Sequence, residues 1–131
     1  MPQITNEELI KKAKSLVKPK KIKHGFTCAD VGCALVTDKK NIFLGVSIDT
    51  CSGMGFCAEH SAIAAMVTNG EYKIEKIVAV LKDGTIIPPC GRCREFMHQI
   101  HKDNSNAEVI IAKNKIVKLK ELIPHVWDEN H

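Results

Sequence analysis

The spacing of apolar residues along the chain alternates between a helical period and a strand period. Three segments have helical spacing, and cap-type residues, glycines or prolines mark their ends. They cover residues 5 or 6 to about 17, 57 to about 69, and 91–100. Five shorter runs, rich in β-branched residues, are predicted strands over residues 31–37, 41–48, 74–81, 108–112 and 116–119. A short helical or irregular tail is predicted over residues 121–127.

This order of elements predicts the fold class. Strands joined by crossover helices imply a mixed sheet with helices on its faces, which is a layered α/β domain. The chain has 131 residues, a length that suits one domain, and 44% of them are hydrophobic, enough for one core. We therefore expect a single domain over residues 1–131.

The charge and the hydropathy of the chain limit the classes of molecule that we expect it to bind. The formal net charge is +4, but seven lysines between Lys11 and Lys23 supply the excess and the remaining chain is mildly acidic. We expect that stretch to be the solvated face of the first helix and a loop. Aromatic residues make up only 5%, which argues against nucleic-acid binding. No apolar run reaches the roughly 20 residues of a membrane span, and Met1-Pro2-Gln3 begins no export signal, so we expect a cytoplasmic protein.

Two cysteine motifs stand at the starts of predicted helices. Cys57-Ala58-Glu59 opens one helix, and Cys90-Gly91-Arg92-Cys93 opens the next. Because residues three apart are neighbours on a helix, Cys90 and Cys93 lie on one side. Helices that follow crossover strands start at the same sheet edge, so three thiolates would meet there. Three protein ligands with an open fourth position are typical of catalytic Zn²⁺, and Glu59 would lie beside that position.

Each cysteine motif alone is weak evidence. A C-x-x-C pair is also found in redox sites and in structural zinc sites, so the prediction depends on both motifs together. A zinc-finger set with His98 and His101 is unfavourable, because Cys93 and His98 would be about 7.5 Å apart along one helix. We expect both histidines at the surface or at a helix end. The remaining cysteines, Cys28, Cys33 and Cys51, are expected to be small apolar residues of the core.

At this point the chain resembles the cytidine deaminase family over nearly its whole length. Val31-Gly32-Cys33-Ala34-Leu35 is similar to the family's first strand, and the cysteine motifs match its two zinc motifs. The resemblance implies a five-stranded mixed sheet, one zinc per subunit and a homotetramer. Residues 89–94 and the final Glu121-Leu122-Ile123-Pro124 to Val126-Trp127 are also similar to the blasticidin S deaminases.

The resemblance implies a hydrolytic deamination in which Glu59 is the general acid and base. Zinc lowers the pKa of water toward about 7, so that hydroxide is available at neutral pH. Glu59 would take the proton of that water, pass it to ring nitrogen N3 of cytosine, and later protonate the leaving amino group. Family members often carry Arg directly after this Glu, where this chain has His60. Arg92 and Arg94 are candidates to replace that charge.

The predicted substrate contacts depart from the family pattern at the sugar end. Ser47 and Asp49 stand where the family usually has Asn and Glu, so both side chains are shorter. Ala58 and Trp127 complete the predicted substrate-binding set. Trp127 has two interpretations, an anchor for the tail or a contact to a substrate, possibly in a neighbouring subunit's pocket.

These observations predict a zinc-dependent hydrolase acting on cytidine or deoxycytidine. The alternative substrate is blasticidin S or another modified cytosine nucleoside. A nucleic-acid editing enzyme would usually have a His in place of Cys57 and a basic groove. A zinc-stabilised binding module without turnover would have no use for Glu59 beside an open metal position.

Overall fold

The computed structural model of the protein describes residues 3–128. The predicted domain covers residues 1–131, and its two ends, residues 1–2 and 129–131, lie outside the described residues. The helices are α1 (Asn6–Ser15), α2 (Ala58–Thr68), α3 (Gly91–Ile100) and α4 (Leu119–Leu122), with 3₁₀ helices η1 (Cys51–Gly53) and η2 (Lys102–Asn106). The strands are β1 (Lys20–Lys23), β2 (Phe26–Thr37), β3 (Ile42–Thr50), β4 (Ile74–Leu81), β5 (Ile86–Ile87), β6 (Glu108–Ala112) and β7 (Lys115–Lys118).

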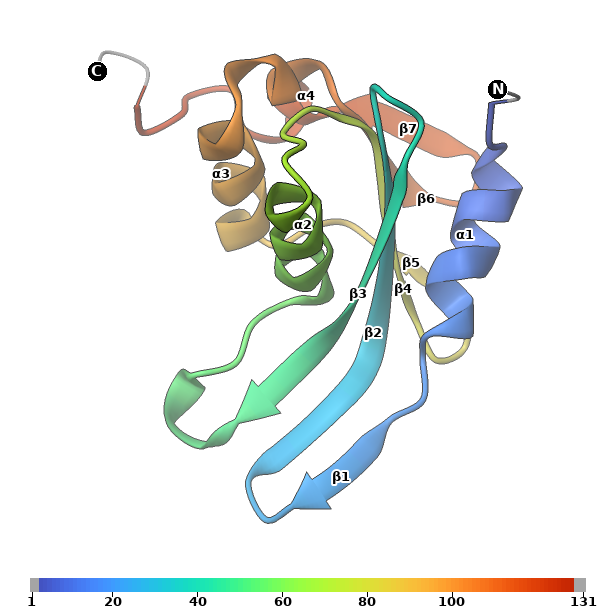
Figure 1. Ribbon diagram of the computed structural model, residues 1–131, viewed down its shortest axis with the longest axis vertical. Helices are drawn as coiled ribbons and strands as arrows, with labels where there is room; N and C mark the ends of the chain where they lie inside the picture. Colours follow the sequence, from blue (N-terminus) through green and yellow to red (C-terminus); the bar gives the residue numbers. More distant parts are fainter. Residues whose placement is uncertain (1–2, 129–131) are drawn as a thin grey trace.

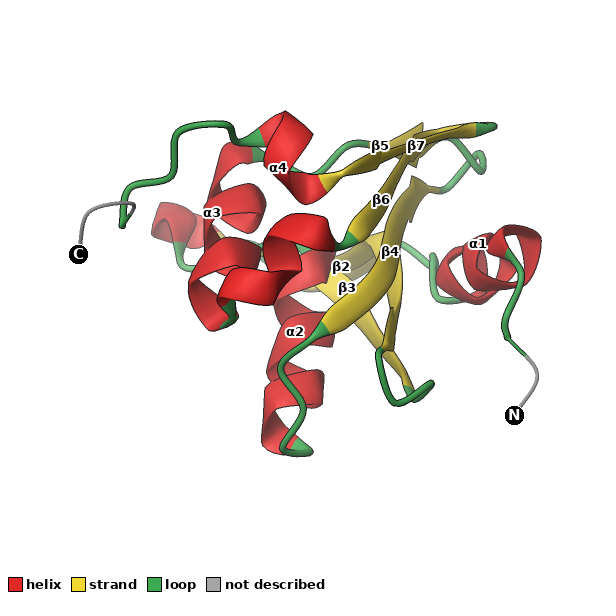
Figure 2. Cartoon of the chain, turned by 90° about the horizontal axis from the view of Figure 1, so that it is seen from above, coloured by secondary structure: helices red, strands yellow, loops and turns green. Residues whose placement is uncertain are grey.

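The strands form one mixed sheet covered by helices on both faces. Its order is β1-β2-β4-β6-β7, with β3 paired to β2 and β5 paired to β4. β4 and β6 are parallel, and the other pairs are antiparallel. α1 covers one face, whereas α2 and α3 cover the other (Figures 1 and 2). This architecture confirms the predicted α/β fold class.

The predicted count of five strands is wrong, because the sheet has seven. All four residues of β1 are exposed, so this lysine-rich edge strand shows no hydrophobic alternation. The basic stretch is therefore partly a strand rather than a loop. β5 has two residues, too few to show a period. β2 also begins at Phe26, well before the predicted residue 31.

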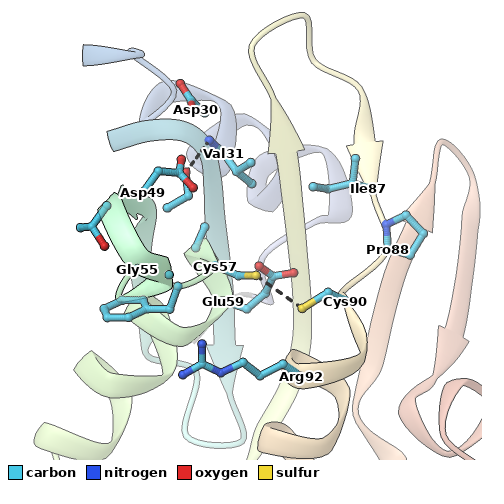
Figure 3. Close-up of a pocket in the computed structure, with 15 residues that line it drawn as sticks. Asp30, Val31, Asp49, Gly55, Cys57, Glu59, Ile87, Pro88, Cys90 and Arg92 are labelled. Carbon is cyan, nitrogen blue, oxygen red and sulfur yellow. Dashed lines mark hydrogen bonds between the residues drawn. The ribbon is translucent and has the colours of Figure 1, made fainter. Parts of the chain in front are cut away.

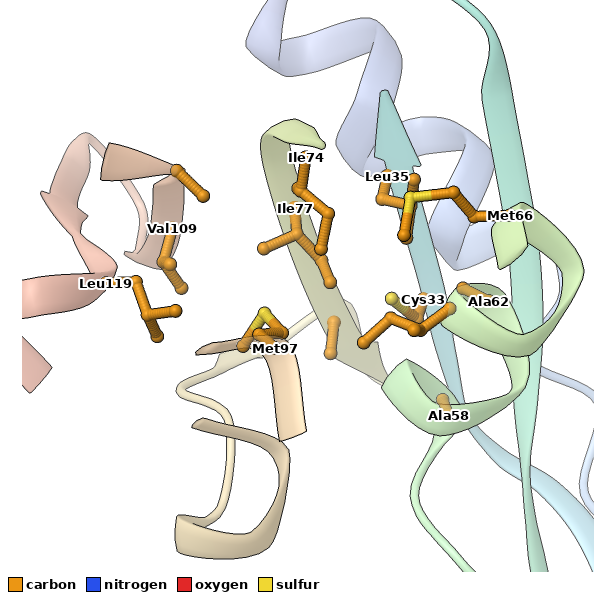
Figure 4. Close-up of a cluster of buried hydrophobic side chains, with 13 residues drawn as sticks. Cys33, Leu35, Ala58, Ala62, Met66, Ile74, Ile77, Met97, Val109 and Leu119 are labelled. Atoms are coloured by element: carbon orange, nitrogen blue, oxygen red, sulfur yellow. The ribbon is translucent and has the colours of Figure 1, made fainter. Parts of the chain in front are cut away.

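The three central strands are buried on both faces. In β2, Cys33 and Leu35 pack toward α2 and α3, whereas Ala34 and Val36 pack toward α1. β4 and β6 alternate in the same way. Figure 4 shows the first cluster, in which Met97 of α3 and Ala62 of α2 meet the sheet. A strand buried on both sides shows a continuous apolar run, as residues 77–81 of β4 do, and β4 has the bounds that the sequence predicted.

None of the helices within residues 3–128 combines the length and the apolar composition that crossing a membrane requires.

A buried asparagine fixes the connection that carries α3 back to the sheet. Asn104, in η2, is fully buried. Its Oδ1 accepts the backbone N–H of Ile74 at 2.8 Å, and its Nδ2 donates to the carbonyls of Tyr72 and Met97 at 3.0 and 2.9 Å. One side chain thus joins the end of α3, the start of β4 and the segment between α2 and β4.

We expect Asn104→Ala to lower the free energy of unfolding by about 2–4 kcal/mol, because it leaves a buried N–H and two carbonyls unpaired. Asn106→Ala, on the exposed side of the same 3₁₀ helix, is the matched control and should change stability by less than about 0.5 kcal/mol. Urea titration followed by circular dichroism measures both. Equal stabilities for the two variants would contradict the role assigned to Asn104.

Candidate metal centre and active site

Three cysteine thiols meet where α2 and α3 begin. Sγ of Cys57 lies 3.4 Å from Sγ of Cys90, which lies 3.5 Å from Sγ of Cys93. All three sulfur atoms lie within 4.8 Å of one another. In a tetrahedral site with Zn–S bonds of about 2.3 Å, sulfurs are about 3.8 Å apart. The spacing and the soft thiolate donors therefore fit one Zn²⁺, as the two motifs predicted.

Local structure explains why these sulfurs converge. Cys57 and Cys90 are the N-cap residues of α2 and α3, and Cys93 lies in the first turn of α3. α2 lies close against β3 at Gly45, where a Cβ atom would collide with the backbone of Ala62. β5 returns along β4, and the two prolines after it end the strand, so that α3 begins beside α2.

The surroundings of the three thiols differ. Burial alone would raise the pKa of Cys90, but hydrogen bonds from the backbone N–H groups of Cys93 and Arg92, and from the neighbouring thiols, lower it. Burial raises the pKa values of Cys57 and Cys93, and nearby negative groups raise them further. Exposed Cys90 is thus the readiest thiolate. A bound cation that offsets their mutual repulsion favours ionisation of all three.

Glu59 lies on the floor of the same site. Its side chain is 4% exposed, and Figure 3 shows it beside Cys57 and Cys90. Burial raises the pKa of the Glu59 carboxyl, and hydrogen bonds from its own backbone N–H and from Cys93 offset part of that rise. A carboxyl group in such a place can both accept and return a proton.

The thiols and Glu59 open into a cavity of about 530 Å³. This volume is typical of sites for small organic molecules. The cavity is lined by most of the residues predicted from the sequence, namely Ser47, Asp49, Cys57, Ala58, Glu59 and Cys90. Cys93 lies beneath the other thiols and is fully buried.

An irregularity in β2 shapes the end of the cavity opposite the thiols. The register between β2 and β3 shifts between Cys28 and Gly32, and Ala29 has a positive φ of 65°. The freed backbone N–H of Val31 donates to Oγ of Ser47 at 3.1 Å. Bulges of this kind re-aim side chains beside functional sites. Asp30 and Asp49 both line the cavity, and Figure 3 shows them toward this end.

His60 also contacts the thiol cluster, and sequence reasoning noted this residue only as a departure from the family. Its Nδ1 lies 3.4 Å from Sγ of Cys93. Burial, and then the charge of Arg92, lower the pKa of His60. Arg92 lines the cavity, whereas Arg94 donates to the carbonyls of Pro89 and Leu122 at 2.8 and 3.1 Å. Arg94 therefore fastens the loop before Cys90 to the tail.

Trp127 does not line this cavity. Its side chain is 69% exposed, and its backbone N–H donates to Oε1 of Glu95 at 3.2 Å. The structure thus places Trp127 on the outside of α3 in the same chain. Its contact with a substrate stays a prediction.

His98, His101 and the other three cysteines lie outside the thiol group. His98 pairs with Asp128 at 3.0 Å, and Nδ1 of His101 accepts the backbone N–H of Asp103. Cys33 belongs to the core and Cys28 is half-buried. The expectation that Cys51 is a core residue is wrong, because it is exposed in η1, beyond the end of β3.

Several lining residues were not singled out as substrate contacts from the sequence. Most come from loops, from strand ends or from the bulge in β2, where no periodic pattern marks them, and Arg92 lies in the first turn of α3. Phe56 carried a signal in the sequence, since it directly precedes Cys57, and in the structure it pairs with Ile48. The residues missed in this way are Asp30, Val31, Thr50, Gly53, Gly55, Phe56, Ile87, Pro88 and Arg92.

Comparison with known proteins agrees with this geometry. Residues 4–109 match the family model described as the cytidine and deoxycytidylate deaminase zinc-binding region. A cytidine deaminase of Mycoplasma genitalium is 34% identical over 103 residues, which cover 74% of this chain and 77% of that protein. A blasticidin-S deaminase of Bacillus cereus is 34% identical over 112 residues, covering 76% of this chain and 78% of that protein.

The fold is also shared with a solved structure. The crystal structure of cytidine deaminase from Mycobacterium leprae superposes with a TM-score of 0.79 at 23% identity, covering 94% of this chain and all of that one (100%). At this identity the likeness concerns the fold alone. The family match, which covers most of the chain and includes the cysteine cluster, decides the assignment: the chain belongs to the zinc-binding cytidine and deoxycytidylate deaminase family.

Proposed function

We propose that this protein is a zinc-dependent hydrolase that deaminates a free cytosine nucleoside. Cytidine or deoxycytidine and water would give uridine or deoxyuridine and ammonia. The observation that carries the proposal is the floor of the cavity, where three thiols within 4.8 Å of one another lie beside the buried Glu59. A structural zinc site has no need of a carboxyl group in that position.

Cys57, Cys90 and Cys93 would hold the metal. When bound, zinc supplies a water molecule of lowered pKa, which is available as a nucleophile at neutral pH. Three protein ligands leave room for that water on the side of the cavity.

Glu59 would carry the protons of the reaction. Its carboxylate accepts a proton from the attacking water and gives it to N3 of the cytosine ring, which makes C4 electrophilic. It then takes the remaining proton from the hydroxyl group added at C4 and passes it to the amino group, so that C4 keeps the oxygen of water and loses ammonia. The buried position of Glu59 favours proton transfer, because desolvation raises the pKa of its carboxyl group and makes the protonated form more accessible.

The opposite end of the cavity would hold the sugar. Ser47 and Asp49 line this end. Ala58 lines the cavity near Glu59, where the cytosine ring would lie. Asp30 is a second carboxylate among the lining residues toward this end. Two carboxylates at this end disfavour a phosphate, so a nucleoside fits better than a nucleotide.

A modified cytosine nucleoside such as blasticidin S is the second candidate substrate. The relative from Bacillus cereus is a blasticidin-S deaminase. The short side chains of Ser47 and Asp49 leave more room at the sugar end than Asn and Glu would, which favours a bulkier substituent. The chemistry at Glu59 and at the metal is the same for either substrate.

We also propose that the enzyme works as a homotetramer in the cytoplasm, without nucleic-acid or membrane partners. Large apolar side chains are exposed on the isolated chain, and burial of such groups drives association. The most exposed are Met54 (77%), Trp127 (69%) and Ile22 (59%).

Removal of the Glu59 carboxylate should abolish most turnover while leaving the metal bound. We expect Glu59→Gln to lower kcat for cytidine by about 10²–10⁴, with zinc content unchanged, because the amide cannot accept the proton. Loss of absorbance near the cytosine band measures turnover, and elemental analysis measures zinc. Glu7→Gln, an exposed acid on α1, is the control and should match the unmodified enzyme. Full activity in Glu59→Gln would refute the assigned role.

Neutralising Asp49 should weaken substrate binding more than chemistry. We expect Asp49→Asn to raise KM for the preferred nucleoside by about tenfold with kcat changed less than about threefold, because a charged hydrogen bond to the sugar is lost. Asp38→Asn, in the exposed β2–β3 turn, is the control. Cytidine, deoxycytidine, CMP and blasticidin S are assayed in parallel. An unchanged KM for every active substrate would exclude Asp49 from recognition, and turnover of none of them would contradict the proposed function.

The oligomeric state is measured by sedimentation equilibrium at the assay concentration. We expect a particle of four times the mass of one chain, and Trp127→Ala together with Met54→Ser should shift it toward smaller species if these side chains are covered. A fully active monomer would rule out the proposed assembly.

A further inference from the structure

His60 occupies a buried position between the two helices that carry the thiols. It lies in the first turn of α2, one turn beyond Cys57, and is 8% exposed. Its Nδ1 is 3.4 Å from Sγ of Cys93, a distance suited to an N–H···S hydrogen bond. Cys93 is fully buried, so water does not compete for this sulfur.

Aromatic side chains fix the plane of the imidazole ring. Phe96, one turn beyond Cys93 on α3, stacks on His60 with ring centroids 4.3 Å apart and an interplanar angle of 3°. Phe56, which precedes α2, lies 6.1 Å away on a tilted plane. A ring held in this way keeps Nδ1 directed at the sulfur, so the contact follows from packing and not from a chance rotamer.

The negative charge of the thiolate cluster gives a reason for this hydrogen bond. Three thiolates and one Zn²⁺ carry a net charge of about −1, and electron-rich thiolates weaken a metal as a Lewis acid. An N–H donor draws electron density from the sulfur and orients it. Arg94 is occupied by two backbone carbonyls, and the backbone N–H groups at the start of α3 serve Cys90.

We propose that His60 is a positioning residue of the metal centre, which donates its Nδ1–H to the thiolate of Cys93 and is held in place by Phe96. The proposal rests on the zinc site of the proposed function. It assigns the Nδ1–H tautomer to His60 and gives this chain a neutral donor at the position where the resemblance led us to expect an arginine.

Nuclear magnetic resonance on the unmodified protein tests the tautomer directly. In ¹⁵N-labelled protein loaded with ¹¹³Cd²⁺, we expect the long-range ¹H–¹⁵N pattern of His60 to show protonation at Nδ1. We also expect scalar coupling between that proton and the cadmium, carried through the sulfur. Protonation at Nε2 alone would overturn the proposal, as would a labile Nδ1 proton without coupling to the metal.

Two variants separate the hydrogen bond from packing. His60→Phe keeps the aromatic ring beside Phe96 and removes the donor, whereas His60→Asn places an amide N–H near the position of Nδ1. With Co²⁺ as probe, we expect the thiolate-to-metal charge-transfer band to move to lower energy in His60→Phe and to stay near its original energy in His60→Asn. Zinc affinity, measured by competition with a chromophoric chelator, should fall by about 10- to 100-fold in His60→Phe.

The outcomes of this comparison are distinct. Equal spectra and zinc affinities for His60→Phe and the unmodified protein would overturn the proposal, and so would equal losses in both variants. Should His60→Phe not fold, the cadmium experiment still decides. None of these measurements needs a substrate, so a protein with the expected signature that deaminates no nucleoside would refute the proposed function and leave the role of His60 standing.

Discussion

Mutual repulsion among three thiolates within 4.8 Å of one another is the constraint on which the site depends. Like charges this close to one another repel, so the arrangement is stable only with a cation at its centre and donors around it. The helix starts at Cys57 and Cys90 supply backbone N–H groups, and zinc supplies the positive charge. Burial raises the pKa of the Glu59 carboxyl beside these thiols, and hydrogen bonds from its own backbone N–H and from Cys93 offset part of that rise.

The fold serves to bring those two helix starts together. Crossover connections place α2 and α3 on the same face of the sheet, and the two-sided burial of β2, β4 and β6 holds that face rigid. Two local features of the backbone then determine how closely these elements approach one another. Gly45 lets α2 lie close to β3, and the register shift after Cys28 turns Val31 toward Ser47. The cavity is therefore framed by regular elements on the side of the thiols and by irregular backbone on the opposite side.

The same division explains what the sequence could predict. Periodicity located the central strands and helices, because each buries a face and shows it as a pattern, and helix-start cysteines with motif spacing located the metal site. β1 and β5 were not predicted, since an exposed strand and a two-residue strand show no such pattern. The bulge at Ala29 and the contact of His60 with Cys93 depend on how separate elements pack, which spacing along one segment does not encode.

X-ray absorption at the zinc edge of the purified protein tests the central claim most directly, because it counts the ligands without requiring a substrate. The account predicts one zinc per chain with three sulfur neighbours at about 2.3 Å and one oxygen or nitrogen neighbour on the cavity side. A zinc held by four sulfurs, or by two sulfurs and two nitrogens, would mean a closed structural site and would contradict the account.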